Sequence, residues 1–212
     1  MHAQTLRSTI PGPAGQLECI IDRPAGEAEL PGFVLVAHPH PLHGGNLDNK
    51  VAHTLARSFL EMGYAALRVN FRGAGASEGT HEDGVGEVDD LEAALAWGRR
   101  ELHAETFFLA GFSFGSAMQS RLAAHLAARN VEPQKLVLVG HSTFHTTPTV
   151  RPDTLVVHGE RDTTVPLAAV MDWARPQLLP VVVLPDTDHF FHRRLDILRR
   201  VVQSAFGWVT PA

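Results

Sequence analysis

The sequence predicts an α/β protein whose mostly parallel sheet is covered by helices on both faces. Short apolar runs alternate along the chain with longer segments that have helical periodicity. These runs are apolar throughout, as is typical of parallel strands that are buried on both faces. Only the first two extended segments are typical of an antiparallel hairpin. We therefore expect about eight strands, with the hairpin at the N-terminus of the sheet.

The expected elements follow one another without a linker. Residues 4–10 and 16–22 flank a turn of Gly12-Pro13-Ala14-Gly15, which predicts the hairpin. Further strands are expected at 33–37, 64–69, 107–110, 135–139, 154–157 and 181–184. Helices are expected around 51–59 and at 85–102, 116–126, 165–178 and 190–208. No repeat or low-complexity segment divides the chain, so residues 1–212 are predicted to form a single domain.

Composition excludes several classes of protein. The chain has 212 residues, of which 44% are hydrophobic and 19% charged, with a net charge of −5. Acidic and basic residues are interleaved, so we expect no nucleic-acid partner and no membrane partner. The single cysteine, Cys19, excludes an intramolecular disulfide and a Cys-rich zinc site. The first residues lack the profile of a signal peptide, and we expect a cytoplasmic protein.

A serine lies between two glycines where a buried strand passes into a helix. The segment Gly111-Phe-Ser-Phe-Gly115 follows the apolar run 107–110 and precedes a helix of small residues. A turn this sharp strains the serine, and side chains at the glycine positions would collide with their neighbours. Ser113 would then lie beside the N–H groups that begin the helix, where negative charge is stabilised. The alternative is an ordinary glycine-rich turn, but the strand and helix around it favour a nucleophile.

Partners for a serine nucleophile are expected at the carboxyl ends of other strands, where functional groups of such sheets gather. His158-Gly-Glu-Arg-Asp162 follows one strand, and Pro185-Asp-Thr-Asp-His189 follows the next. The order serine, acid, histidine is the one that the glycine-flanked serine turn requires. We expect His189 to take the proton of Ser113, and Asp162 to orient the imidazole and stabilise its charged form.

Each partner has a rival nearby in the sequence. Glu160 is the rival acid, but it lies nearer the end of its strand. His192 is the rival base, but we expect it one turn inside the last helix and directed away from the strand. Asp186 and Asp188 are so close to His189 that capping of this helix is their expected role.

The loop His38-Pro-His-Pro-Leu-His-Gly-Gly45, after the first parallel strand, is the expected oxyanion site. Proline has no N–H, so His40 carries the only backbone donor of the Pro-His-Pro stretch, and the prolines restrict its conformation. Leu42 is the alternative donor, and Phe114 is expected to supply the second N–H. Each such donor typically contributes about 3 kcal/mol in the transition state. The substrate is expected to contact three side chains near these groups, Leu42, His43 and Phe112.

With these motifs the chain resembles the α/β-hydrolase superfamily, in particular its small bacterial members without a lid, which carry a His-Pro-His-Pro-x-x-Gly-Gly loop. The resemblance covers nearly the whole chain and rests on 38–45, 48–50, 70–73, 111–115, 158–162 and 188–189. It implies hydrolysis of carboxylic esters by Ser113, Asp162 and His189. It does not imply a particular natural substrate.

The length of one connection bears on the size of the substrate. In larger relatives a cap follows the strand after the nucleophile helix, whereas here residues 141–153 are too few for a helical lid. We therefore expect an open site that takes small or short-acyl esters as its partners. Thioester, lactone or peptide cleavage uses the same groups and remains an alternative. A catalytically inactive binding protein on this fold is the other alternative.

Two other ligand classes fit the sequence less well. Gly73-Ala-Gly-Ala-Ser-Glu-Gly79 is similar to a dinucleotide loop, but its third glycine lies one position late. We expect this loop to shape the wall of the site, with Arg72 in a structural ion pair. His38, His40 and His43 alternate with prolines and lack a carboxylate cluster, which argues against a metal site. We expect neither a metal nor another cofactor.

Overall fold

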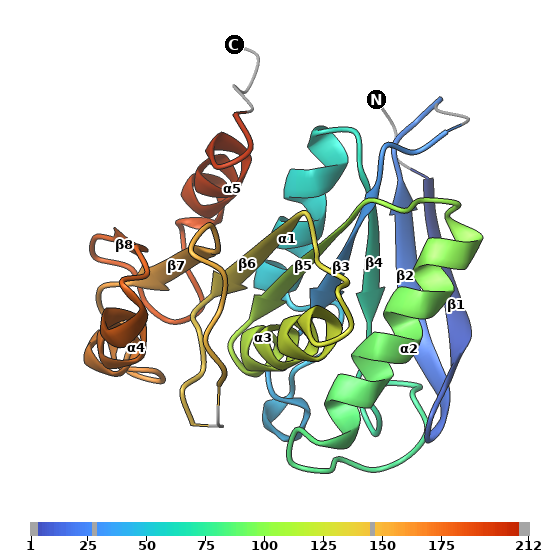
Figure 1. Ribbon diagram of the computed structural model, residues 1–212, viewed down its shortest axis with the longest axis horizontal. Coiled ribbons are helices and arrows are strands. Elements are labelled where there is room, and N and C mark those ends of the chain that lie inside the picture. The colour runs from blue at the N-terminus through green and yellow to red at the C-terminus, as the bar shows by residue number, and fades with distance from the viewer. Residues whose placement is uncertain (1–3, 27–28, 145–146, 208–212) are drawn as a thin grey trace.

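One eight-stranded sheet forms the centre of the computed structural model, which describes residues 4–26, 29–144 and 147–207. The strand order is β1-β2-β4-β3-β5-β6-β7-β8 (Figure 1). β1 (Gln4–Gly12) and β2 (Gly15–Arg23) pair in antiparallel fashion, and β2 is also antiparallel to β4. The other neighbours are parallel. The predicted mostly parallel sheet with an antiparallel N-terminal hairpin is confirmed.

The central parallel strands are buried, as their uninterrupted apolar runs predicted. The strands after the hairpin are β3 (Phe33–Ala37), β4 (Ala65–Val69), β5 (Phe107–Phe112), β6 (Lys135–Val139), β7 (Leu155–Gly159) and β8 (Val181–Leu184). Every residue of β3, β4 and β5 is buried. The loops that follow β3 and β5 therefore begin in the middle of the carboxyl edge of the sheet.

Helices cover both faces of the sheet. They are α1 (Lys50–Glu61), α2 (Gly86–Glu101), α3 (Phe114–Ala127), α4 (Leu167–Ala174) and α5 (Leu195–Ser204). α2, α3 and α4 contribute to one apolar core, which contains Leu91 and Leu122. α1 and α5 contribute to a second core, which contains Leu55 and Leu198. In Figure 1, α2 and α3 lie in front of the sheet and α1 lies behind it.

Two predicted helices are longer than those observed. The helix predicted over 190–208 is wrong at its start, because α5 begins only at Leu195. Phe191 and Arg193 have φ angles of 54° and 60°, and this left-handed conformation interrupts a helix. Residue 208 lies outside the described part of the chain. The helix predicted over 165–178 is α4 followed by a 3₁₀ turn at Arg175–Gln177, because Pro176 lacks the N–H that an α-helix needs.

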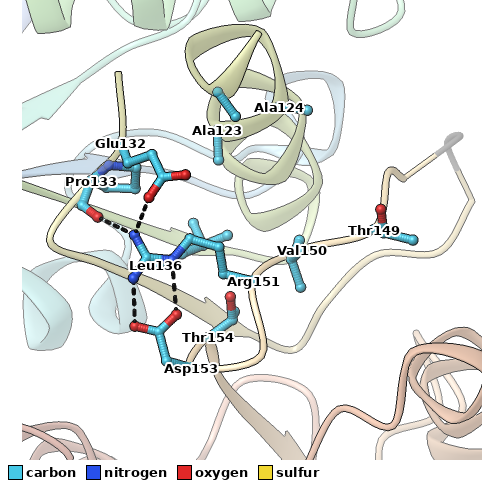
Figure 2. Close-up of a pocket in the computed structure, with 11 residues that line it drawn as sticks. Ala123, Ala124, Glu132, Pro133, Leu136, Thr149, Val150, Arg151, Asp153 and Thr154 are labelled. Atoms are coloured by element: carbon cyan, nitrogen blue, oxygen red, sulfur yellow. Dashed lines mark hydrogen bonds and ion pairs between the residues drawn. The ribbon is translucent and has the colours of Figure 1, made fainter. Parts of the chain in front are cut away.

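A short connection joins β6 to β7, where a cap would be inserted. Its described residues, 140–144 and 147–154, form neither helix nor strand. Arg151 fastens the end of this connection, because its guanidinium donates to Glu132 at 2.8 Å and to both oxygens of Asp153 at 3.0 Å (Figure 2). The predicted absence of a cap is thus matched by a tethered connection in the described residues.

Candidate active site

Ser113 lies in the turn between β5 and α3, in the middle of the sheet. Its backbone angles, φ 55° and ψ −120°, are rare for a residue with a side chain, and such strain typically costs about 1–3 kcal/mol. The Ser113 N–H donates to Val139 O at 2.9 Å, which ties the turn to β6. The hydroxyl is therefore held at the N-terminus of α3.

The two glycines beside Ser113 are required by close backbone contacts. A Cβ atom at Gly111 would lie 2.5 Å from Gly115 O. A Cβ atom at Gly115 would lie 2.4 Å from Ala37 O and 2.5 Å from His38 O. All three distances are far inside van der Waals contact, so only glycine lets α3 begin this close to the ends of β3 and β5. The steric argument made from the sequence agrees with this packing.

Ser113, His189 and Asp162 form a hydrogen-bonded chain although they come from three separate loops. Ser113 Oγ lies 3.0 Å from His189 Nε2, and His189 Nδ1 lies 2.6 Å from Asp162 Oδ2. The three residues are at most 9% exposed. A carboxylate only accepts, so Nδ1 carries the proton and Nε2 is left to accept one from the serine. The arrangement can therefore remove the proton of the Ser113 hydroxyl.

The Asp162 carboxylate is held by further donors. Its Oδ1 atom accepts the N–H groups of Thr164 at 2.9 Å and of Val165 at 2.8 Å. Its Oδ2 atom lies 3.4 Å from Nε2 of His158, which donates to Val165 O at 2.9 Å. Burial lowers the pKa of His158, so this imidazole is neutral. The carboxylate therefore has a fixed orientation toward His189.

The two rivals of the site residues lie elsewhere. Glu160 is exposed, and its carboxylate accepts the N–H of Asp186 at 2.8 Å. His192 is exposed and contacts Asp188, with 2.6 Å between Nδ1 and Oδ2. The prediction that His192 lies inside a helix is wrong, because it precedes α5. The predicted capping by Asp186 and Asp188 is also wrong, since the N-cap of α5 is Arg194, without a side-chain hydrogen bond.

The loop after β3 folds back on itself beside the turn that carries Ser113. Gly45 and His43 both donate their N–H groups to His40 O, at 3.0 and 3.1 Å. The N–H of Leu42 donates to the His40 ring at 3.3 Å, so the alternative donor from the sequence is engaged within the loop. The ring of His40 lies 4.8 Å from that of Phe114, which begins α3. The structure therefore brings together the two residues expected to supply the oxyanion donors.

The three residues expected to contact substrate have different surroundings. Leu42 is 68% exposed. His43 stacks on His40, with 4.5 Å between ring centroids. Phe112 is completely buried, and its ring lies 4.9 Å from that of His189. Phe112 therefore supports the imidazole from the protein side and has no surface for a substrate, which corrects the expectation.

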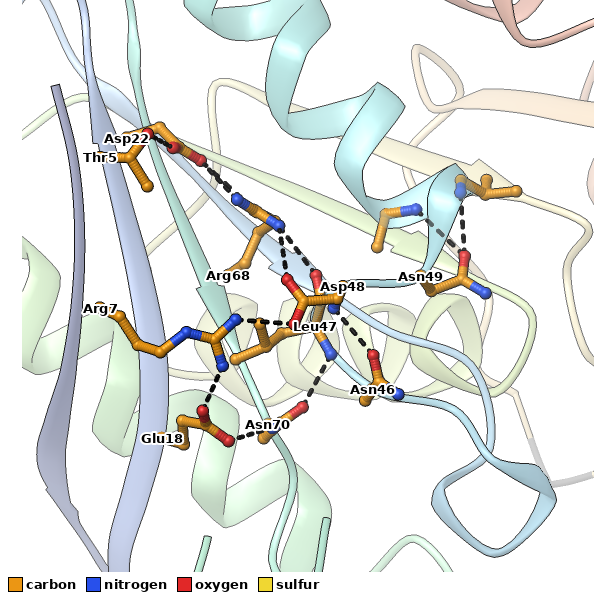
Figure 3. A network of polar contacts seen from close by, with 12 residues as sticks. Thr5, Arg7, Glu18, Asp22, Asn46, Leu47, Asp48, Asn49, Arg68 and Asn70 are labelled. Atoms are coloured by element: carbon orange, nitrogen blue, oxygen red, sulfur yellow. Dashed lines mark hydrogen bonds and ion pairs between the residues drawn. The ribbon is translucent and has the colours of Figure 1, made fainter. Parts of the chain in front are cut away.

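Polar contacts fix the neighbouring loops. His38, which is fully buried, contacts Pro39 O through Nδ1 at 2.6 Å and accepts the N–H of Phe71 through Nε2 at 3.1 Å. Asn70 accepts the N–H of Leu47 at 2.7 Å and donates to a carboxylate oxygen on β2 at 2.7 Å (Figure 3). The His38–Phe71 and Leu47–Asn70 contacts join the segment after β3 to the segment after β4, and the second Asn70 contact ties the end of β4 to β2.

The glycine-rich loop after β4 is organised by an ion pair. Arg72 contacts Asp90 at 2.8 Å and Glu82 at 3.0 Å, and the Arg72 and Asp90 side chains are at most 4% exposed. The predicted structural role of Arg72 is confirmed.

Both imidazole nitrogens of His38 have protein partners, and in the described residues no group of three His, Cys, Asp or Glu side chains is arranged to hold a metal ion. No helix of the described chain has the length and apolar composition of a membrane span.

Three residues next to Ser113, His189 and Asp162 were not assigned a role from the sequence. Ser116 Oγ donates to Ser113 O at 2.6 Å and contacts Nδ1 of His141 at 3.0 Å. His141 and His158 are completely buried. Both histidines lie at strand ends, which was an available signal. Their burial depends on the packing of α3 and α4, which no local pattern encodes.

Comparison with known proteins agrees with this geometry. Residues 15–134 match the family model described as X-Pro dipeptidyl-peptidase (S15 family). An α/β serine hydrolase from Xanthomonas campestris, described as lacking a lid, is 35% identical, with a TM-score of 0.87 over 100% of this chain and 98% of the other. An α/β serine hydrolase homologue from Coxiella burnetii is 37% identical, with a TM-score of 0.81 over 93% and 95%.

A curated relative covers less of the chain. An uncharacterized protein of Rickettsia prowazekii is 43% identical over 111 residues, which are 51% of this chain and 46% of that protein. The match thus spans about half the length of that relative. The family model covers more than half of the chain, and the Xanthomonas protein covers all of it. This protein therefore belongs to the lidless α/β serine hydrolases and to the family described as X-Pro dipeptidyl-peptidase (S15 family).

Proposed function

We propose that this protein hydrolyses carboxylic esters with small or short acyl groups. The observation that carries the proposal is the 3.0 Å contact between Ser113 Oγ and His189 Nε2, continued at 2.6 Å to Asp162. A serine hydroxyl is a weak nucleophile, and a neutral imidazole within hydrogen-bond distance activates it. The three groups thus have the relative positions that acyl transfer requires.

The reaction has two steps, in both of which His189 moves the proton. Ser113 Oγ attacks the ester carbonyl while Nε2 of His189 takes the hydroxyl proton, and Asp162 stabilises the resulting imidazolium. The imidazolium then gives this proton to the leaving alkoxide, so an alcohol departs and an acyl group remains on Ser113. Water attacks the acyl group with His189 again as base, which releases the acid and restores the serine.

We assign the oxyanion of each tetrahedral intermediate to the N–H groups of Phe114 and His40. Phe114 is the first residue of α3, where the helix dipole stabilises negative charge. The contact between the His40 and Phe114 rings supports a shared site, and the N–H of Leu42 is used within the loop, which counts against Leu42 as a donor. Each donor is expected to contribute about 3 kcal/mol to the transition state.

The rim of the site supports a small, partly apolar substrate. Leu42, Phe144 and Phe190 are 68%, 71% and 45% exposed, and they follow β3, β6 and β8 at the same edge of the sheet. The connection between β6 and β7, which carries Phe144, is too short to form a cap over this edge. We therefore propose short-chain aryl esters as substrates, turned over in solution without activation by a lipid surface, and neither nucleic acid nor membrane as partner.

Peptide cleavage is the second candidate, and the matched family model favours it. A serine peptidase uses the same nucleophile, base and oxyanion donors, so the site geometry serves both reactions. The two candidates differ in the leaving group, which is an alkoxide or phenoxide for an ester and an amine for a peptide. Rates on matched acetyl and butyryl aryl esters, aryl thioesters and X-Pro anilides separate them. Faster turnover of the X-Pro anilides than of the esters would assign the protein to the peptidases.

Covalent labelling tests the shared part of the mechanism. A fluorophosphonate should label the wild-type protein at Ser113, and Ser113→Ala should lose both labelling and ester turnover while keeping its circular dichroism spectrum. Ser204→Ala, which removes an exposed serine at the end of α5, is the matched control and should behave as wild type. Ester cleavage retained by Ser113→Ala would remove this serine from the mechanism.

A further inference from the structure

Three buried polar atoms beside the triad have no hydrogen-bond partner among the described residues. They are Nε2 of His141, Nδ1 of His158 and Nε1 of Trp173. The two histidines have no exposed surface. Buried polar atoms without a partner are rare in folded proteins because losing hydration without a replacement is costly. Three of them on neighbouring elements indicate a bound polar ligand.

The protein partners of the two histidines determine their tautomers. Nε2 of His158 lies 2.9 Å from Val165 O, which only accepts, so Nε2 carries the hydrogen and Nδ1 is an acceptor. Ser116 uses its own hydrogen for the 2.6 Å bond to Ser113 O, so Nδ1 of His141 donates to this hydroxyl at 3.0 Å. Burial lowers the pKa of His141 to about 3, which keeps it neutral. Its Nε2 atom is therefore also an acceptor.

The three side chains come from neighbouring elements, and His141 lies close to both of the others. His141 follows β6, and its ring centroid lies 4.1 Å from that of Trp173 on α4. β6 and β7 are neighbours, and the N–H of Gly140 donates to Val157 O at 2.9 Å, so His141 and His158 lie at adjacent strand ends. The rings of His141 and Trp173 are tilted at 40° to each other, and neither the indole N–H nor Nε2 of His141 has a hydrogen-bond partner among the described residues.

We propose that a single buried water molecule binds between His141, His158 and Trp173. A water can donate two hydrogen bonds and accept two. It would donate to the two imidazole nitrogens and accept from the indole N–H, so one molecule satisfies all three atoms. A metal ion does not fit, because an indole N–H offers no lone pair. An anion does not fit either, because two of the three groups are acceptors.

The water connects the two sides of the site. Through His141 and Ser116 it reaches the carbonyl oxygen of Ser113, within the strained turn. Through His158 it reaches the carboxylate of Asp162, 3.4 Å from Nε2. The nucleophile turn and the acid loop are thereby joined by a second route that does not pass through His189. The water site is inferred from hydrogen bonding alone. Any effect of this water on catalysis rests on the proposed function.

A crystal structure of the wild-type protein that resolves ordered waters is the direct test. We expect one water about 2.7–3.2 Å from each of the three nitrogens. An absent water, or a separate water on each nitrogen, overturns the proposal. Imidazole ¹⁵N spectra at pH 7 are a second test in solution. His141 should carry its hydrogen on Nδ1 and His158 on Nε2, and the opposite tautomer of either would leave one water unable to satisfy the set.

A matched pair of variants measures whether the hydrogen bond from the Trp173 indole to the water stabilises the protein. Trp173→Phe keeps an aromatic ring against His141 but removes the donor to the water. Trp97→Phe makes the same change on α2, in a side chain packed against the same core, and controls for lost volume. Trp173→Phe should lower Tm by more than Trp97→Phe does. A smaller decrease, or an increase, means that the N–H had no partner and overturns the proposal. None of these tests uses turnover, so inactivity on esters would overturn only the proposed function.

Discussion

The Nε2 atom of His158 lies 3.4 Å from the Oδ2 atom of Asp162, the oxygen that also binds His189. A neutral and completely buried N–H thus stands beside the carboxylate of the proposed triad. This N–H donates to Val165 O, but its partial positive charge still lies near Oδ2, where it stabilises the carboxylate and reduces the field that the carboxylate exerts on other groups. We therefore expect His158 to modulate how strongly Asp162 stabilises a charged His189 imidazole.

Replacing His158 by phenylalanine is expected to lower kcat on short aryl esters about tenfold, because Asp162 and its loop lose a positioning contact. The acidic limb of the pH–rate profile should also move to higher pH, since an Asp162 without this N–H dipole beside it favours a charged imidazole more strongly. Rates measured between pH 5 and 8 test both effects. His53→Phe, on α1 behind the sheet, is the control. An unchanged acidic limb would show that His158 does not act through Asp162.

Stability should fall as the pH decreases below neutrality because histidines are buried in their neutral form, and two of them, His38 and His141, have strongly lowered pKa values. Burial lowers the pKa of His38 to about 4 and that of His141 to about 3, from an ordinary value of 6.5. The unfolded chain therefore binds protons at a higher pH than the folded chain does. Their contribution is complete above about pH 6.5 and is lost as the pH falls toward these lower values. At 1.36 kcal/mol per unit, His38 alone accounts for about 3 kcal/mol.

Urea unfolding at pH 7, 5.5 and 4 measures this loss. His38→Gln removes one of the two groups and serves as the comparison. It should be less stable at pH 7, because its contacts with Pro39 and Phe71 are altered, but its stability should depend less on pH between 6.5 and 4. An identical pH dependence in wild type and variant would contradict the assignment of the acid sensitivity to His38.

Much of the fold and three of the site positions could be predicted because local patterns carry them. The strands are uninterrupted apolar runs, and the turn at Ser113 is marked by glycines that close contacts require. Asp162 and His189 follow strands whose carboxyl ends share one edge of the sheet, so their position along the chain places them near Ser113. These signals depend only on the order of the elements.

Other features depend on contacts between distant elements and could not be read from the chain. The late start of α5 follows from the left-handed backbone at Phe191 and Arg193, which are not residues that mark such a turn. Phe112 was expected to face substrate because it neighbours Ser113, but its ring is buried against His189. His141 contacts Ser116 on α3 and Trp173 on α4, and neither contact can be predicted from the sequence around it.

Gly115→Ala should disrupt the nucleophile turn. The added Cβ would lie within 2.6 Å of the backbone of β3 and the loop after it, atoms that cannot move without displacing the centre of the sheet. We expect the loss of nearly all ester turnover and a destabilisation of about 3 kcal/mol or more. Gly63→Ala is the control, because Gly63 has φ 90° but no atom within 4 Å of an added Cβ. It should cost about 1 kcal/mol and leave kcat unchanged. Equal effects of the two variants would mean that the contact with β3 does not require a glycine at 115.

Leu42→Ala should reveal whether the loop after β3 binds the substrate. Leu42 is 68% exposed on the 3₁₀ turn at Pro41–His43, beside the ring of His40, so its removal costs little stability. If its side chain packs on the aryl or acyl group before and during reaction, the variant should raise KM about tenfold with little change in kcat, which is the effect of losing uniform binding. Leu6→Ala is the matched control, because Leu6 is 60% exposed on β1 at the edge of the sheet. Its kinetics should equal those of the wild type. A decrease of kcat without a change of KM in Leu42→Ala would instead assign this residue to the positioning of His40, and the apolar contact with substrate would have to come from Phe144 or Phe190.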